Sequence, residues 1–209
     1  MAEEREVKLP VPDTFVLPDL SGLAGGISVV DRGEHELDAV YWDTETLALQ
    51  RAGFGLRYRT TDGSAGHWTL KAESRRDGPA VVRDEIDIDG EPHEPPRLVL
   101  DRVGAVLHDG ALAPVVTVHT RRHTHDLMGP DQQPLAEIAD DRVTIRDGDR
   151  DVTSFREVEV ELMGSVDAAL VDAIVERLHA AGAGPVDPTP KYVRGLLALG
   201  FDIPTGVLQ

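Results

Sequence analysis

Short alternating segments dominate this chain and constrain its fold more than any other feature. Apolar and polar residues alternate with a period of two in one segment after another, and clusters of Gly, Pro and Asp separate the segments. Such alternation predicts half-buried β-strands, and many strands at this spacing are typical of a barrel or sandwich. The expected strands lie at residues 4–11, 26–43, 53–61, 66–73, 80–89, 114–128, 134–145 and 154–163.

Helical patterning is limited to a few places, so the expected fold class is α+β. The clearest helix is near the C-terminus, where Val166, Leu170, Ile174 and Leu178 recur at helical spacing before a Gly stop. The expected helices lie at residues 12–23, 95–107, 165–182 and 189–200.

One face of several expected strands carries charges of both signs. Period-two geometry puts alternate residues on the same face of a strand. The simplest interpretation is that each charged face is the wet side of a half-buried sheet. These faces, however, favour Arg and Glu at every second position, and neighbouring carboxylates repel unless a cation lies between them. The shared-face sets are Glu4, Glu6 and Lys8; Arg57 and Arg59; Arg83, Glu85 and Asp87; and Glu157, Glu159 and Glu161.

A sheet closed with these faces inward would form a polar tunnel whose apolar outer face is covered by helices. A mixed-sign interior suits a multiply charged anion together with a hard metal. Carboxylates bind Mg²⁺ or Mn²⁺ through oxygen, and Arg and Lys bind phosphate oxygens.

The overall composition narrows the classes of function. The formal net charge is −17, and no basic tail offsets it, so we expect no nucleic-acid partner. No apolar run is long enough to cross a membrane, and the N-terminus does not resemble a signal peptide. The absence of cysteine excludes disulfides and thiolate chemistry and suits a cytoplasmic protein.

Segments in order along the whole chain resemble the CYTH domain, also called the triphosphate tunnel metalloenzyme superfamily. The opening segment, EREVKL, resembles the Glu-x-Glu-x-Lys signature of that family. Each piece alone is a weak signal, and their order makes the set specific. The sequences of these segments are most similar to the CYTH domains that precede a C-terminal CHAD domain in actinobacterial proteins. The other matching segments are YWDT, LALQRAGFGLRYRT, WTLK, RDEID, LAEIADDRV, FREVEVEL and PTPKYVRGL.

The resemblance implies an eight-stranded antiparallel tunnel, with helices packed outside, that binds triphosphate and a divalent metal, Mg²⁺ or Mn²⁺. By position, Glu6 and Glu159 are the implied catalytic carboxylates, and Glu85 would orient the basic residues. The implied metal ligands are Glu4, Glu6, Asp141, Glu157, Glu159 and Glu161. The implied phosphate-binding residues are Lys8, Arg57, Arg59, Lys71, Arg83, Arg121, Arg122 and Lys191.

The segment VHTRRHTHDL departs from the family pattern, which has a basic pair at spacing two ending in Arg. Either Arg121 or Arg122 is the equivalent, and the spacing to Leu127 favours Arg122. The segment also contains His119, His123 and His125. They could bind a transition metal or add pH sensitivity, but a structural or surface role is the simpler interpretation, because the family's metal site is built from carboxylates.

The leading functional hypothesis is a metal-dependent triphosphatase acting on inorganic triphosphate. The alternatives are a non-catalytic module that binds polyphosphate, and a thiamine triphosphatase or adenylate cyclase of the same fold. A barrel with a purely structural role would leave the paired carboxylates unexplained. We expect residues 1–200 to form a single CYTH domain and residues 201–209 to be a tail or the start of a linker, with a CHAD domain as a possible partner on a longer chain.

Overall fold

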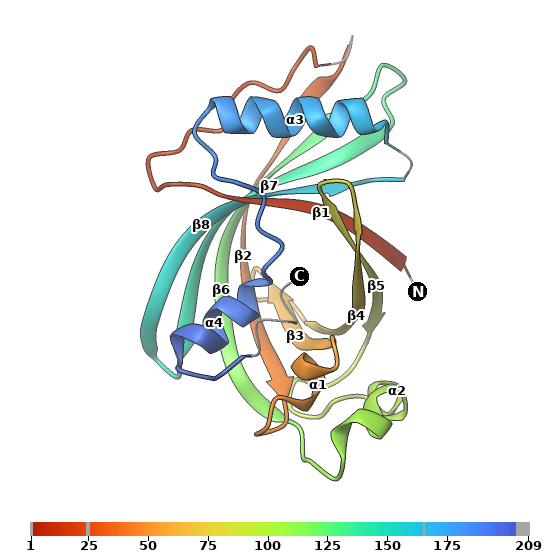
Figure 1. Cartoon of the computed structure of the whole chain (residues 1–209), viewed down its shortest axis with the longest axis vertical. Coiled ribbons are helices and arrows are strands. Elements are labelled where there is room, and N and C mark those ends of the chain that lie inside the picture. The colour runs from red at the N-terminus through yellow and green to blue at the C-terminus, as the bar shows by residue number, and fades with distance from the viewer. Residues whose placement is uncertain (1, 24–25, 165, 204–209) are drawn as a thin grey trace.

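Eight antiparallel strands close into a barrel in the computed structural model, which describes residues 2–23, 26–164 and 166–203. The strand order around the barrel is β1-β5-β4-β3-β2-β6-β7-β8 (Figure 1). Each strand expected from the alternating pattern is confirmed, and the barrel resolves the choice between barrel and sandwich. The strands are β1 (Ala2–Pro10), β2 (Ser28–Asp43), β3 (Gly55–Thr61), β4 (His67–Asp77), β5 (Ala80–Ile88), β6 (Ala113–Met128), β7 (Pro134–Asp147) and β8 (Arg150–Leu162).

Three of the helices in the described residues pack outside the strand wall (Figure 1), as expected for an α+β tunnel, and the last one packs against its inner face. Three expected helices form, and α1 is a short addition that the sequence did not predict. None of the described helices is long and apolar enough to span a membrane. The helices are α1 (Ala48–Arg51), α2 (Arg97–Leu107), α3 (Ala168–Ala180) and α4 (Lys191–Ala198).

The helix expected at residues 12–23 was a wrong prediction. The segment forms turns and irregular loop instead. Two prolines interrupt it, and its carbonyl groups are used elsewhere, because the Arg156 guanidinium donates hydrogen bonds to the backbone oxygens of Asp13 and Phe15, both at 2.8 Å. The loop packs Phe15 and Leu20 against the barrel instead of presenting a helical face.

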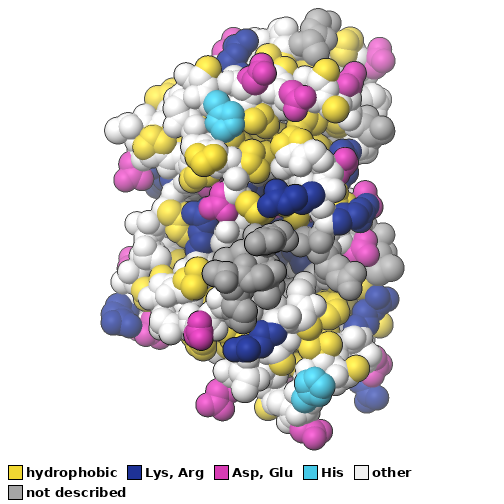
Figure 2. Space-filling view, in the orientation of Figure 1, with side chains coloured by type: hydrophobic (Ala, Val, Ile, Leu, Met, Phe, Trp, Pro, Cys, Tyr) yellow, Lys and Arg dark blue, Asp and Glu magenta, His cyan; other side chains and the backbone are white. Residues whose placement is uncertain are grey.

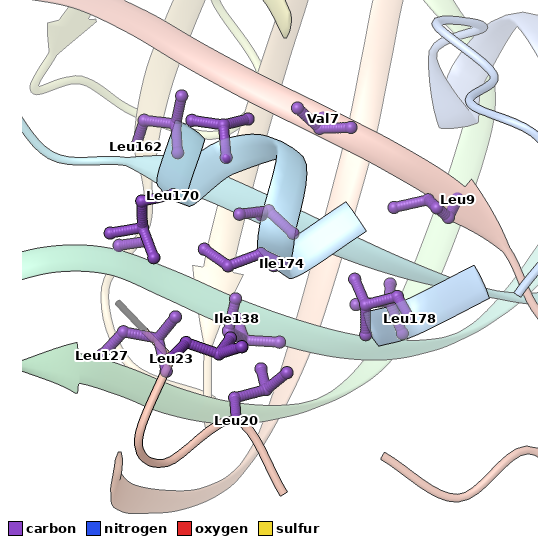
Figure 3. Packing of buried hydrophobic residues seen from close by; sticks show 14 of the residues in the cluster. Val7, Leu9, Leu20, Leu23, Leu127, Ile138, Leu162, Leu170, Ile174 and Leu178 are labelled. Carbon is purple, nitrogen blue, oxygen red and sulfur yellow. The ribbon is translucent and has the colours of Figure 1, made fainter. Parts of the chain in front are cut away.

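The largest apolar core lies on the outer face of β1, β7 and β8, beneath α3. Figure 3 shows Leu170, Ile174 and Leu178 of α3 pointing into this layer. They meet Val7 of β1 and Ile138 of β7, and all five side chains are buried. The helical spacing in the sequence therefore identified the packed face of α3. Asp167 begins the helix by accepting a hydrogen bond from the Ala169 N–H.

A second helix, α4, packs closely against β6 and β7. Gly195 permits this approach, because a Cβ at that position would lie 2.7 Å from Val116 Cγ2. The helix contributes Val193 and Leu196 to a cluster that also contains Ile203. This packing fixes the position of Lys191, the first residue of α4. The expected tail at residues 201–209 lies outside the described residues beyond Ile203.

The remaining outer face, over β3 and β4, is covered by α1 and α2. Trp68 is fully buried there between Val99 and Val103 of α2 and Leu49 of α1. On the surface seen in Figure 2, acidic, basic and hydrophobic side chains are interspersed. Buried charged side chains such as Glu6, Lys8 and Glu159 belong to the inner faces of the strands.

Candidate functional site

The inner faces of the strands enclose a cavity of about 560 Å³. Among the described residues, nine basic and eight acidic side chains line it. Charged side chains deep in the cavity are shielded from solvent, because Glu6 and Lys8 are only 4% and 6% exposed. The charged strand faces of the sequence thus face inward, and the interpretation as solvent-exposed faces is wrong for these strands.

Carboxylates gather on one arc of the barrel, made by β7, β8 and β1. We call this set the acidic wall: it consists of Glu4, Glu6, Glu137, Glu159 and Glu161, all of which line the cavity. Strands β8 and β1 are neighbours, and their register pairs Glu6 with Glu161 and Lys8 with Glu159. The two Glu-x-Glu motifs, far apart in sequence, are therefore brought side by side.

Glu6 and Glu159 are held ionised by cations. Burial alone would raise the pKa of Glu6, but Lys8, with Lys71 and Arg83, lowers it to about 2. The Lys8 ammonium lies 2.9 Å from Glu6 and 3.5 Å from Glu159, and Arg83 also pairs with Glu6. Burial opposes ionisation of Glu159 as well, yet Lys191, Lys8 and Arg122 hold its pKa well below the ordinary value.

Glu161 is in the opposite situation. Burial, together with the negative charges of Glu4 and Glu137, raises its pKa to about 7. Within the described residues Glu161 forms no ion pair. This end of the acidic wall therefore has more negative charge than the protein itself neutralises, which is the environment that a bound cation would relieve.

Basic residues gather on the next arc, made by β5, β4 and β3. We call this set the basic wall: it consists of Arg57, Arg59, Lys71 and Arg83. Lys71 is anchored by Glu4 at 2.6 Å and by Glu85 at 3.2 Å. Glu85 also lies 4.0 Å from Arg57, which places it where an orienting carboxylate is expected.

Arg59 has more positive charge around it than the protein compensates. Repulsion from Arg57, followed by burial and by Arg122, lowers its pKa to about 10. In the described part of the chain Arg59 forms no ion pair, and its buried Nε has no hydrogen-bond partner. The Nε of Arg57 is likewise buried and unpartnered. The basic wall is thus arranged for an anion that enters the cavity.

The structure separates the two neighbouring arginines of β6. Arg122 lines the cavity and donates to Asp141 at 2.8 and 2.7 Å and to Glu159 at 2.6 Å. Arg121 lies exposed on the outer face of the strand, because alternate residues point to opposite faces. Of the two candidates, Arg122 faces the cavity, as the spacing to Leu127 favoured, and Arg121 does not; phosphate binding by Arg122 stays a prediction.

A third charged group lies where α4 meets β7 and β8. The Lys191 ammonium is 2.9 Å from Asp141, 2.7 Å from Glu157 and 2.6 Å from Glu159. These three carboxylates lie close enough together to hold a metal ion. In this structure the ammonium group takes the central position, so Asp141 and Glu157 have a cation from the protein itself.

These observations meet the pattern of one family. The model of the CYTH domain matches residues 2–190. The chain belongs to the CYTH domain family. It is also similar to the uncharacterized protein Rv2226 of Mycobacterium tuberculosis, with 32% identity over 218 residues. That alignment covers 97% of this chain and 42% of the relative, so the chain spans less than half the length of the curated protein it matches.

Solved structures share the CYTH fold at low sequence identity. The protein HpAC1 from Hippeastrum is 16% identical, with a TM-score of 0.56 over 96% of this chain and 98% of that chain. The Bacillus halodurans protein bh2851 is 15% identical, with a TM-score of 0.52 over 77% of this chain and 82% of that chain. At these identities the likeness shows the fold.

One acidic residue of this CYTH site, Glu137, was not singled out from the sequence. Glu137 shares a strand face with Asp141, so counting by twos along β7 could have found it. Tyr41 and Tyr192 stack at a centroid distance of 4.8 Å and border the cavity. Burial would raise the pKa of Tyr41, but the adjacent Arg57 and Lys71 lower it.

The YWDT segment contributes a residue, Asp43, that binds backbone N–H groups. Asp43 accepts backbone hydrogen bonds from Thr44 at 2.7 Å, Leu49 at 2.8 Å and Gln50 at 2.9 Å. These bonds satisfy N–H groups at the start of α1. Asp43 therefore organises the turn after β2 and is not part of the charged walls.

Proposed function

We propose that this CYTH protein is a divalent-metal-dependent triphosphatase that acts on inorganic triphosphate in the barrel cavity. The observation that carries the proposal is the imbalance of charge on its two walls. Among the described residues neither Glu161 on the acidic wall nor Arg59 on the basic wall forms an ion pair, and like charges dominate the shift of each pKa together with burial. A metal–triphosphate complex satisfies both at once.

The basic wall supplies the contacts that a triphosphate needs. Guanidinium groups bind phosphate oxygens with paired N–H donors, and Lys71 adds a point charge. Their burial strengthens these interactions relative to water. Arg57 and Arg59, whose Nε atoms are unpartnered, bind the substrate in this proposal, and Lys71, Arg83 and Arg122 contact its remaining oxygens.

The acidic wall fits a hard divalent cation. Glu4, Glu6, Glu159 and Glu161 offer carboxylate oxygens from two adjacent strands, which is the ligand chemistry of Mg²⁺ and Mn²⁺. A metal held there supplies neutralising charge on the phosphate oxygens and a more acidic bound water. The raised pKa of Glu161 supports this placement over the Asp141–Glu157–Glu159 group, where Lys191 already neutralises the charge.

The carboxylates differ in the proton chemistry that they can perform. Glu6 and Glu159 keep their negative charge, so they suit orienting water and holding cations. Glu161, whose pKa is raised to about 7 in the metal-free protein, would give up its proton when a metal binds there. Phosphoryl transfer depends mainly on positioning and charge stabilisation, which the rigid strand walls provide.

The choice of plain triphosphate rests on the shape and lining of the cavity. The bordering aromatic pair, Tyr41 and Tyr192, is already stacked on itself, which argues against an adenine or thiamine platform. HpAC1 from Hippeastrum is described as having a dominant triphosphatase activity, which agrees with the proposal. The runner-up is a module that binds polyphosphate without cleaving it, supported by the same basic wall.

We further propose that the domain extends over residues 1–200, acts in the cytoplasm, and is joined to a CHAD domain in a longer chain. The length of the Mycobacterium tuberculosis relative supports the presence of another domain, because this chain matches 42% of it.

The direct test is phosphate release from inorganic triphosphate with Mg²⁺ or Mn²⁺, compared with longer polyphosphate, ATP and thiamine triphosphate. We expect release only with metal, and fastest with triphosphate. A Glu4→Gln/Glu161→Gln variant should lose the release, and Arg121→Ala should retain it. Tight binding of triphosphate without any release would favour the binding module and overturn the hydrolase proposal.

A further inference from the structure

A cluster of histidines lies on the outer face of the barrel, across the strand from the cavity. His123 and His125 are alternate residues of β6 and lie on its outer face. The preceding residue, Arg122, lies on the opposite face and lines the cavity. The neighbouring strand β2 brings Asp31 directly opposite His125. Two adjacent strands thus offer two imidazoles and one carboxylate from a rigid part of the sheet.

The three side chains already converge. His123 Nε2 lies 2.8 Å from Asp31 Oδ1, and the two imidazole rings lie 4.4 Å apart, centroid to centroid. One ligand atom from each residue lies within 4.8 Å of the other two. Asp31 is fixed in this orientation because its Oδ1 also accepts the Gly33 N–H at 2.8 Å, at the bulge of β2.

His125 has an unused nitrogen in this cluster. Its Nδ1 is buried and has no hydrogen-bond partner among the described residues. Burial, followed by the adjacent His123, lowers the pKa of His125, which favours the neutral ring that binds metal. A buried ring nitrogen without a partner is costly unless a ligand satisfies it.

His119, on the same face of the same strand, provides an internal comparison. Its Nδ1 lies 2.9 Å from Asp38, and its Nε2 lies 2.9 Å from Glu36. Both ring nitrogens therefore have carboxylate partners already. Asp140, the nearby carboxylate on β7, is likewise taken by the Arg156 guanidinium at 2.6 and 2.8 Å. Of these neighbouring groups in the described part of β6 and β7, His125 is the one with a buried ring nitrogen that has no partner.

We propose that Asp31, His123 and His125 form a transition-metal site of the zinc class on the outer face of the barrel. Two imidazoles and one carboxylate suit Zn²⁺, Co²⁺, Ni²⁺ and Cu²⁺, whereas Mg²⁺ prefers sites made of oxygen. Three protein ligands leave a position for water or a further ligand. The site is separate from the triphosphate site, and its existence does not depend on the proposed hydrolase activity.

The test is a calorimetric titration of the full chain, free of any polyhistidine tag, with Zn²⁺ in excess Mg²⁺. The excess Mg²⁺ competes with Zn²⁺ for the tunnel carboxylates, and the histidine variants identify the Zn²⁺ that binds at the cluster. We expect one Zn²⁺ per chain, binding more than about 100-fold weaker in His123→Ala/His125→Ala, since losing ligands costs more than losing their supporting groups. The matched control His119→Ala should bind as the unmodified chain does.

A second measurement does not depend on the variants folding. On addition of Zn²⁺, the imidazole ¹⁵N resonances of His123 and His125 should shift, and those of His119 should stay in place. Absence of Zn²⁺ binding by the unmodified chain, equal binding by the double variant, or a shift of His119 alone would each overturn the proposal.

Discussion

The two faces of strands β1 and β8 bury side chains of opposite character. Outward, Val7 and Val160 are fully buried under α3 in an apolar layer. Inward, Glu6, Lys8 and Glu159 are almost as deeply buried, but as a charged network. Apolar burial stabilises the fold, whereas desolvating charges costs free energy that ion pairing only partly recovers. We infer that the apolar outer face of these strands stabilises the barrel, whereas the charged inner face serves to bind a ligand.

The largest expected effect is on stability and comes from the outer face. Ile174→Ala removes a fully buried side chain of α3 from the apolar layer. We expect the free energy of unfolding to fall by about 2–5 kcal/mol. Urea unfolding followed by circular dichroism measures this loss.

The exposed residue Glu176, on the same helix, gives the matched control. Glu176→Ala should change the free energy of unfolding by less than about 0.5 kcal/mol. An equal loss for both variants would show that α3 is not held by its apolar face, and the contrast between the two faces would fail.

A change on the inner face should affect activity instead of stability. The carboxyl of Glu161 has a pKa raised to about 7. Glu161→Gln substitutes an uncharged amide of the same shape for it. We expect metal-dependent phosphate release to fall by about 10²–10³-fold, similar to the loss of one charge-stabilising group at an active site.

The same variant should be at least as stable as the unmodified chain above pH 7 without metal, because the repulsion from Glu4 and Glu137 is gone. Thermal unfolding in a chelating buffer checks this. A large drop in Tm together with the loss of activity would mean that Glu161 supports the fold, contrary to the comparison.

A change in the basic wall should weaken the binding of triphosphate without affecting the outer face. Arg59→Ala removes a guanidinium without breaking an ion pair to any described residue. Charge-assisted hydrogen bonds contribute about 1.5–3 kcal/mol, so triphosphate should bind about 10- to 100-fold more weakly. Calorimetry with triphosphate and Ca²⁺ or Mg²⁺ measures the change, and Arg121→Ala on the outer face should leave affinity unaltered.

The smallest expected effect is a pH dependence. A raised carboxyl pKa means that the folded chain binds more protons than the unfolded chain between the ordinary value of 4.5 and about 7. The metal-free protein should therefore lose stability as the pH rises through that window. Because metal replaces this proton, the rise in Tm on adding Mn²⁺ should be larger above pH 7 than below it.

The charged faces of the strands were more predictable from the sequence than the contacts within the site. Alternation placed the cavity-facing residues of β1, β3, β4, β5 and β8, since side-chain direction in a strand depends only on counting by twos. The spacing to Leu127 favoured Arg122 over Arg121. The irregular segment at residues 12–23 was missed because Arg156, remote in sequence, takes its carbonyl groups.

Long-range packing explains the other differences. Lys191, which was expected to bind phosphate, lines the cavity, and its ammonium also pairs with Asp141, Glu157 and Glu159, which the sequence did not predict. That placement depends on the close approach of α4 at Gly195, which no local pattern encodes. The pairing of Asp31 with His123 is similar, because it requires the register of β2 against β6.

The proposed function is tested most directly by a crystal structure with triphosphate and Mn²⁺, with the ion located by its anomalous scattering. We expect Mn²⁺ among Glu4, Glu6, Glu159 and Glu161, with the phosphates against Arg57 and Arg59 and with Lys191 still in place. An ion among Asp141, Glu157 and Glu159 with Lys191 displaced, or a triphosphate bound away from the basic wall, would contradict it.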